Sequence, residues 1–116
     1  MGKRHKAREL ALMVLYELDF RPDPPETVLR EFWRQQAVPP EVQAFAESLV
    51  HGTVAQRAEI DRTIQQHASH WSLSRIAPVE RNVLRLAAYE LLYRDDIPER
   101  VAINEAIELA KSYGSE

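Results

Sequence analysis

The chain has 116 residues, 45% of them hydrophobic, so it is long enough for one hydrophobic core and too short for two. No cysteine is present, which excludes disulfide bonds and thiolate metal sites and fits a reducing compartment such as the cytoplasm. The net charge of −3 is unevenly distributed: residues 1–8 carry four of the 15 bases and none of the 18 acids, which predicts an acidic body with a basic tip.

The first half of the chain is divided by proline into segments with helical periodicity. A first helix is predicted over residues 3–19, with one apolar stripe facing the core, and the proline-rich segment 21–25 ends it. A short second helix follows around residues 29–36 and stops at Pro39-Pro40. Apolar spacing predicts a third helix around residues 42–54 and a fourth around 60–71, with Trp33 and Trp71 both expected in the core.

The second half of the chain is predicted to hold the central helix, over residues 78–94. Pro78 suits a first helical turn, and apolar residues surround most of the circumference, as in a helix buried on several sides. A last helix is expected over residues 101–113, with Gly114 as its stop. No segment alternates as a strand would, so the predicted fold is all-α, a compact bundle of about six helices.

Residues that could support catalysis or bind a cofactor do not converge. The three glycines, at positions 2, 52 and 114, cannot form a phosphate-binding loop. His67 and His70 could share a helix face but lack a third metal ligand, and Asp95-Asp96 is typical of helix capping. The longest apolar run, residues 10–16, is too short to span a bilayer. We therefore predict no enzymatic activity, cofactor, metal or membrane span.

The cations of the basic tip disfavour the helix that carries them. A helix N-terminus is partly positive, so each exposed cation there costs on the order of 0.3–1 kcal/mol. A bound phosphate would relieve this cost, because cations and free N–H groups both favour an anion. A solvated, frayed helix end explains the composition equally well, so these residues alone leave both interpretations open.

Leu12 and Tyr16 are predicted to point away from the apolar stripe of the first helix. An apolar and an aromatic side chain outside the core suggest a contact with something else. That contact could be a partner protein, a stacked base, or the second helix folding back.

Two stretches of the sequence are more specific than helical periodicity alone. Residues 4–11, a basic cluster leading into Ala-Arg-Glu, followed by Leu15-Tyr16, are similar to the opening of the NusB family. Residues 78–91, continuing through 96–98 to 101–111, resemble its most specific motif. The resemblance implies a helical bundle that binds boxA RNA of ribosomal RNA transcripts together with a small-subunit ribosomal protein, NusE. It also implies an antitermination complex with NusA, NusG and RNA polymerase.

The resemblance also implies particular site residues. Tyr16 matches a residue that faces the partner protein, as does Glu80, and we expect Leu12 beside Tyr16 to take part. His5 stands where an arginine is often found, which predicts a weaker or pH-dependent contact. The residues expected to contact RNA are Lys3, Arg4, His5, Lys6, Arg8, Lys111 and Tyr113.

The family pattern continues past residue 116 into another helix, so we expect residues 1–116 to form a single RNA-binding domain that lacks this last helix. Its absence would expose part of the apolar face of the last two helices and favour self-association, for example as a homodimer. Two alternatives remain open. The chain could be an accessory domain of a ribosomal RNA methyltransferase, or a purely protein-binding adapter.

Overall fold

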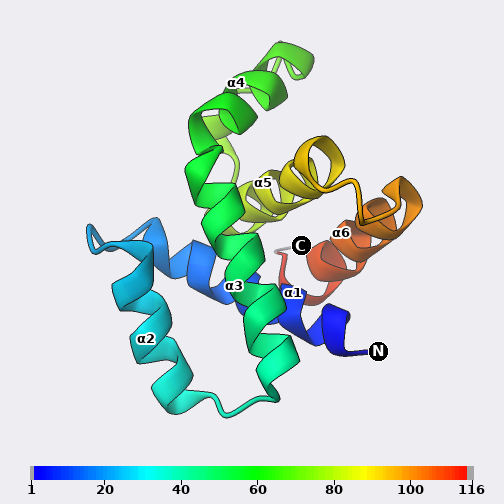
Figure 1. Cartoon of the computed structure of the whole chain (residues 1–116). Coiled ribbons are helices and arrows are strands. Elements are labelled where there is room, and N and C mark those ends of the chain that lie inside the picture. Colours follow the sequence, from blue (N-terminus) through cyan, green and yellow to red (C-terminus); the bar gives the residue numbers. More distant parts are fainter. Residues whose placement is uncertain (1, 115–116) are drawn as a thin grey trace.

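The computed structural model describes residues 2–114, which form six α-helices, one short 3₁₀ helix and no strand (Figure 1). The predicted all-α class is therefore confirmed, and most predicted helix ends lie within a few residues of the observed ones. The elements are α1 (Lys3–Leu18), α2 (Pro25–Gln35), α3 (Pro40–Ala55), α4 (Arg57–His67), η1 (Leu73–Arg75), α5 (Pro78–Tyr93) and α6 (Glu99–Tyr113).

Proline sets the start of half of the helices. Pro25, Pro40 and Pro78 are the first residues of α2, α3 and α5. Their fixed φ suits a first turn, and the N–H group that proline lacks would have no intrahelical acceptor there. The residue before each of them has a ψ near 150°, as the proline ring requires. Each proline therefore also keeps the residue before it out of the helix.

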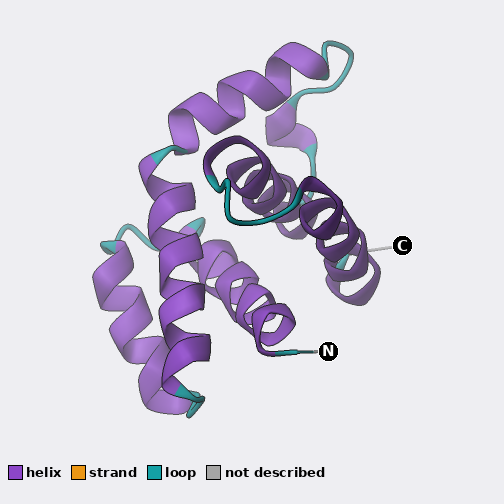
Figure 2. Ribbon diagram, turned by 45° about the vertical axis from the view of Figure 1, so that its right-hand side comes forward, coloured by secondary structure: helices purple, strands orange, loops and turns teal. Residues whose placement is uncertain are grey.

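The core lies around α1, which packs against α2, α3 and α5 (Figures 1 and 2). The predicted apolar stripe is buried, from Ala7 through Leu10 and Val14 to Leu15. Leu12 is only 3% exposed, so the prediction that it lies outside the buried face was wrong. It borders Val79 of α5 and Tyr113 of α6, and this second covered side widens the buried arc of α1 beyond one stripe.

Helix α5 is central, as predicted, because it packs against α1, α3, α4 and α6. It crosses α3 closely: a Cβ atom at Gly52 would overlap the ring of Tyr89, so glycine permits this approach. One side of α5 is uncovered, and Leu84, Leu91 and Leu92 are exposed there. They line an apolar groove of about 680 Å³ between α4, α5 and the end of α6.

The two tryptophans differ from each other in burial. Trp33 packs partly buried against the core and donates its indole N–H to Glu47 at 2.8 Å. Trp71 is 67% exposed, so its predicted core position was wrong. Helix α4 ends at His67, and Trp71 therefore lies in the following loop and not on the apolar face of the helix. No helix in the described part of the chain has both the length and the apolarity needed to cross a membrane.

Candidate nucleic-acid interface

The first two turns of α1 present three exposed cations, Lys3, Arg4 and Lys6. The first turn has no acidic residue and no side-chain cap, so the helix dipole there is uncompensated by α1 itself. Lys3 pairs with Glu41 of α3 at 2.6 Å, and this contact lowers the pKa of the Glu41 carboxyl. Both side chains are more than half exposed, so this surface pair is weak and an anionic ligand can displace it.

An aromatic ring lies beside these cations. The guanidinium carbon of Arg4 lies 4.4 Å from the ring centroid of Phe45 in α3, a cation–π distance. Lys3, Arg4, Phe45 and Ser48 border a surface hollow of about 560 Å³ next to the tip. Phe45 was not among the residues that the sequence predicted to contact RNA. The hollow combines positive charge with a ring face, a combination suited to a nucleotide.

Arg8 differs from the other predicted RNA contacts in its burial. Its side chain is 2% exposed and donates three hydrogen bonds to Glu90 of α5, at 2.9 to 3.1 Å. Glu90 is equally buried, so each charge depends on the other. The guanidinium of Arg8 therefore ties α1 to α5 below the surface. A contact between Arg8 and RNA stays a prediction, and it would require this pair to open.

His5 joins α1 to α6. Its Nδ1 lies 2.7 Å from a carboxylate oxygen of Glu105, and its Nε2 lies 3.5 Å from Glu9. The ring is about a quarter exposed, and each of its two nitrogens faces a carboxylate. His5 therefore links α1 to α6 next to the exposed cations.

The predicted residues near the end of α6 lie away from the tip. Lys111 is exposed in the last turn of α6, six residues beyond Glu105, which corresponds to about 9 Å along the helix. Tyr113 is half-buried. Its pKa is raised mainly by this burial and to a smaller extent by the nearby Glu9 carboxylate. Tyr113 borders the hollow that contains Leu12 and Tyr16. The structure therefore groups Tyr113 with the predicted partner-protein residues and not with the cations.

That hollow is small, about 220 Å³, and mostly apolar. Tyr16 is 41% exposed at its rim and packs against Phe20, with ring centroids 5.0 Å apart. Met13 of α1 and Val79 of α5 also line the hollow and were not predicted as partner-facing residues. Glu80, the neighbour of Val79 in sequence, lines the apolar groove along α5 and not this hollow. An exposed aromatic pair beside an apolar hollow is typical of a protein-binding surface.

Among residues 2–114, no group of three or more histidine and carboxylate side chains is arranged to hold a metal ion. His67 bonds through Nδ1 to the carbonyl oxygen of Thr63 at 3.0 Å. The His67 side chain therefore takes part in its own helix.

Comparison with known proteins gives consistent matches. The model of the NusB family matches residues 5–116. A transcription antitermination protein NusB from Anaeromyxobacter sp. (strain Fw109-5) is 51% identical over 98% of this chain and 80% of its own length. Among solved structures, NusB of T. maritima has a TM-score of 0.86 at 36% identity, over 100% of this chain and 81% of that one. A chain from the crystal structure of antitermination factors NusB and NusE in complex with dsRNA has a TM-score of 0.88 at 31% identity, over 100% and 86%.

Proposed function

The chain belongs to the NusB family, and from that premise we propose that it is a transcription antitermination factor that binds boxA-type RNA of ribosomal RNA transcripts together with NusE. The observation that carries the proposal is the exposed cluster of Lys3, Arg4 and Lys6 beside the Phe45 ring, on a body that is otherwise acidic. Charge separation of this kind orients the basic tip toward a polyanion, because the acidic body repels the polyanion.

Electrostatics would supply most of the RNA affinity. If each of the three exposed cations neutralises one phosphate, log affinity should fall against log salt with a slope of about 2, at about 0.7 per phosphate of a single strand. Unstacked bases would then be read by rings and polar groups near the tip, with Phe45 as a stacking surface. His5, Lys111 and Tyr113 are proposed as further contacts along α1 and α6.

Arg8 is proposed to act chiefly through position. Its hydrogen bonds to Glu90 fix the orientation of α1 about its own axis relative to α5. Arg4 lies one helical turn before Arg8, so this orientation places its guanidinium over the Phe45 ring. A substitution of Arg8 would therefore weaken RNA binding through the orientation of the tip.

The surface around Tyr16 is proposed to bind NusE. Its support is the exposed ring pair of Tyr16 and Phe20 next to a hollow that Leu12 lines from below. Glu80 would add a polar contact at the edge, as polar groups do at interface rims. RNA and partner protein would thus occupy adjacent parts of α1.

The proposed activity is binding and assembly. We propose that the complex with RNA and NusE joins NusA, NusG and RNA polymerase in the cytoplasm, and that residues 1–116 act as one RNA-binding domain. Catalysis has no part in this proposal.

The test is RNA binding by the triple variant Lys3→Ala/Arg4→Ala/Lys6→Ala, measured by fluorescence anisotropy with a boxA-like single-stranded RNA. Affinity should fall roughly a hundredfold or more at 50 mM salt, if three phosphate contacts are lost. The matched control removes three exposed arginines elsewhere, Arg30→Ala/Arg34→Ala/Arg100→Ala.

The control variant should retain most of the affinity, and both variants should keep the helical circular dichroism of the parent. Equal losses in both variants would refute the tip as the RNA site. Equal binding of boxA-like and scrambled RNA, with NusE present, would refute sequence-specific recognition. Binding of NusE without any RNA affinity would favour a protein-binding adapter.

A further inference from the structure

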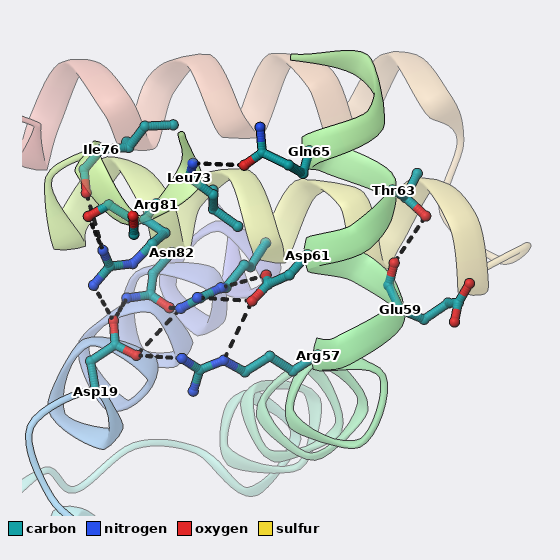
Figure 3. A network of polar contacts seen from close by, with 12 residues as sticks. Asp19, Arg57, Glu59, Asp61, Thr63, Gln65, Leu73, Ile76, Arg81 and Asn82 are labelled. Atoms are coloured by element: carbon teal, nitrogen blue, oxygen red, sulfur yellow. Dashed lines mark hydrogen bonds and ion pairs between the residues drawn. The ribbon is translucent and has the colours of Figure 1, made fainter. Parts of the chain in front are cut away.

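A second concentration of arginines lies at the other end of α1. Asp19, the residue that follows α1, is 5% exposed in its side chain and is surrounded by Arg57, Arg81, Arg85 and Asn82 (Figure 3). Asp61 of α4 accepts two hydrogen bonds from Arg85, at 2.8 and 3.1 Å. Three guanidinium groups of this cluster therefore share two carboxylates, and the cluster keeps an excess of positive charge.

That excess is carried by Arg57, the most exposed of the three. Arg81 and Arg85 both donate hydrogen bonds to Asp19. Arg57 reaches Asp19 and Asp61 only at ion-pair distances of 3.4 and 3.8 Å, and its side chain is 47% exposed. Its N–H groups therefore retain capacity for a ligand that arrives from solvent.

The same arginines line a pocket between α4, η1 and the start of α5, with a volume of about 520 Å³. Arg62 stands at its rim, 57% exposed and paired with the equally exposed Glu59. Asp61 is the only acid among the lining residues in the described part of the chain. The lining consists of Arg57, Asp61, Arg62, Gln65, Ser72, Leu73, Ser74, Arg81 and Arg85.

The loop that forms one wall of the pocket is held in place by Arg81 and Gln65. Arg81 donates to the carbonyl oxygens of Ser74 and Ile76, and the Gln65 side chain binds the backbone N–H of Leu73 at 2.8 Å. The loop from α4 to α5 is therefore fixed to both helices. A prearranged donor-rich pocket binds an anion without a large ordering cost.

We propose that this pocket binds a backbone phosphate of the RNA strand whose other phosphates lie at the basic tip. The inference rests on the proposed function and extends it to a second site at the opposite end of α1. The 16 residues of α1 span about 24 Å, and an unstacked single strand covers more length per nucleotide than the ~3.4 Å rise of a stacked helix. A 20-mer therefore reaches both sites, whereas a 4-mer is too short to reach both even when it is fully extended.

The experiment uses Arg57→Gln/Arg62→Gln with two single-stranded RNAs that share one boxA-like core, a 20-mer and a 4-mer. For the 20-mer, affinity at 50 mM salt should fall roughly fivefold to tenfold and the salt slope by about 0.7, as for one lost phosphate. The 4-mer should bind the variant and the parent equally, because it is too short to reach the pocket from the tip. The matched control, Arg30→Gln/Arg34→Gln on α2, removes the same charge and should change neither affinity.

A loss on the 20-mer no larger than that of the control would overturn the second site, as would equal losses on the 20-mer and the 4-mer. If the parent protein bound neither RNA, the proposed function would fall, and this inference with it. Arg62→Glu serves as a second variant, since Arg62 pairs with the exposed Glu59 and, among the described residues, makes no contact with the Asp19 cluster. It should weaken 20-mer binding while thermal stability stays that of the parent.

Discussion

The two ends of α1 use positive charge in different ways. At the N-terminal end, Lys3, Arg4 and Lys6 are exposed, and the ion pair of Lys3 with Glu41 lies on the surface. At the C-terminal end, Arg81 and Arg85 are mostly buried around Asp19. A cation that is buried away from water needs a carboxylate beside it, whereas an exposed cation remains free to bind an anionic ligand from solution. Burial thus separates cations that hold the fold from cations that recognise a ligand.

Arg4 and Arg8 show the same contrast within a single helical turn. Both guanidinium carbons lie over the Phe45 ring, at 4.4 and 5.5 Å. Arg4 is exposed, while Arg8 continues the same face into the interior and meets Glu90. Arg4 and Arg8 lie four residues apart on the same face of α1, but the neighbouring helices cover only Arg8.

The largest expected effect is on the buried pair. Arg8→Met leaves Glu90 buried and unpaired, and the free energy of unfolding should fall by about 3–5 kcal/mol. Urea denaturation followed by circular dichroism measures it. Arg8→Met/Glu90→Met removes both charges and should recover most of the loss. A double variant as unstable as the single one would show that packing, and not the unpaired charge, is responsible.

A smaller loss is expected at the other end of α1. Asp19→Asn removes the carboxylate charge that binds Arg81 and Arg85. The free energy of unfolding should fall by roughly 2–3 kcal/mol. Asp23→Asn is the control, because its partner Arg21 is held on the surface also by Glu17 and Glu31. Thermal unfolding should show little change for that control. Equal losses in both variants would remove the contrast between buried and exposed arginine clusters.

The exposed tip should respond with opposite signs in stability and binding. Lys6→Glu replaces a cation near the positive end of the α1 dipole with an anion, and should stabilise the fold by about 0.3–1 kcal/mol. The same change should weaken RNA binding, because a repulsive charge replaces an attractive one. Chemical denaturation and fluorescence anisotropy measure the two effects. A parallel loss of both would show that Lys6 supports the fold.

The smallest effect is expected at Asp96, in the turn before α6. Hydrogen bonds from Arg94 lower the pKa of the Asp96 carboxyl from 3.8 to about 2, with a minor contribution from Arg4. A lowered pKa means that the carboxylate stabilises the fold above about pH 4, and that this contribution disappears as the pH falls toward 2. Asp96→Asn should melt lower than the parent at neutral pH, and the difference should vanish near pH 2. A difference independent of pH would contradict the assignment.

Much of the fold could be predicted from local patterns. The starts of α2, α3 and α5 follow from Pro25, Pro40 and Pro78, because proline fits a first turn wherever it occurs. The buried stripe of α1 follows from its 3.6-residue period. The position predicted for Trp71 was wrong because the apolar periodicity of the sequence continues past His67, where the helix ends. An end without proline or glycine leaves little trace in the sequence.

The candidate site could be predicted only in part. The basic character of residues 3–8 was visible, and so was the aromatic residue at position 16. The partners of these residues come from distant segments: Phe45 and Glu41 lie on α3, and Glu90 lies on α5. The Asp19 cluster joins α1, α4 and α5 across more than 60 positions of sequence, as the bond from Arg85 shows. No local spacing marks such a cluster.

The sequence by itself determined the helical class, the place of the proline starts, the apolar face of α1 and the clustering of positive charge at its beginning, because each depends on residues within one or two turns of each other. Tertiary structure alone decided which charges are free. Lys3, Arg4, Lys6 and Arg8 are alike in sequence, and the packing of α5 against α1 places Glu90 beside Arg8 and removes that one cation from the surface. Burial depends on the whole assembly of helices, and a helical wheel describes only one of them.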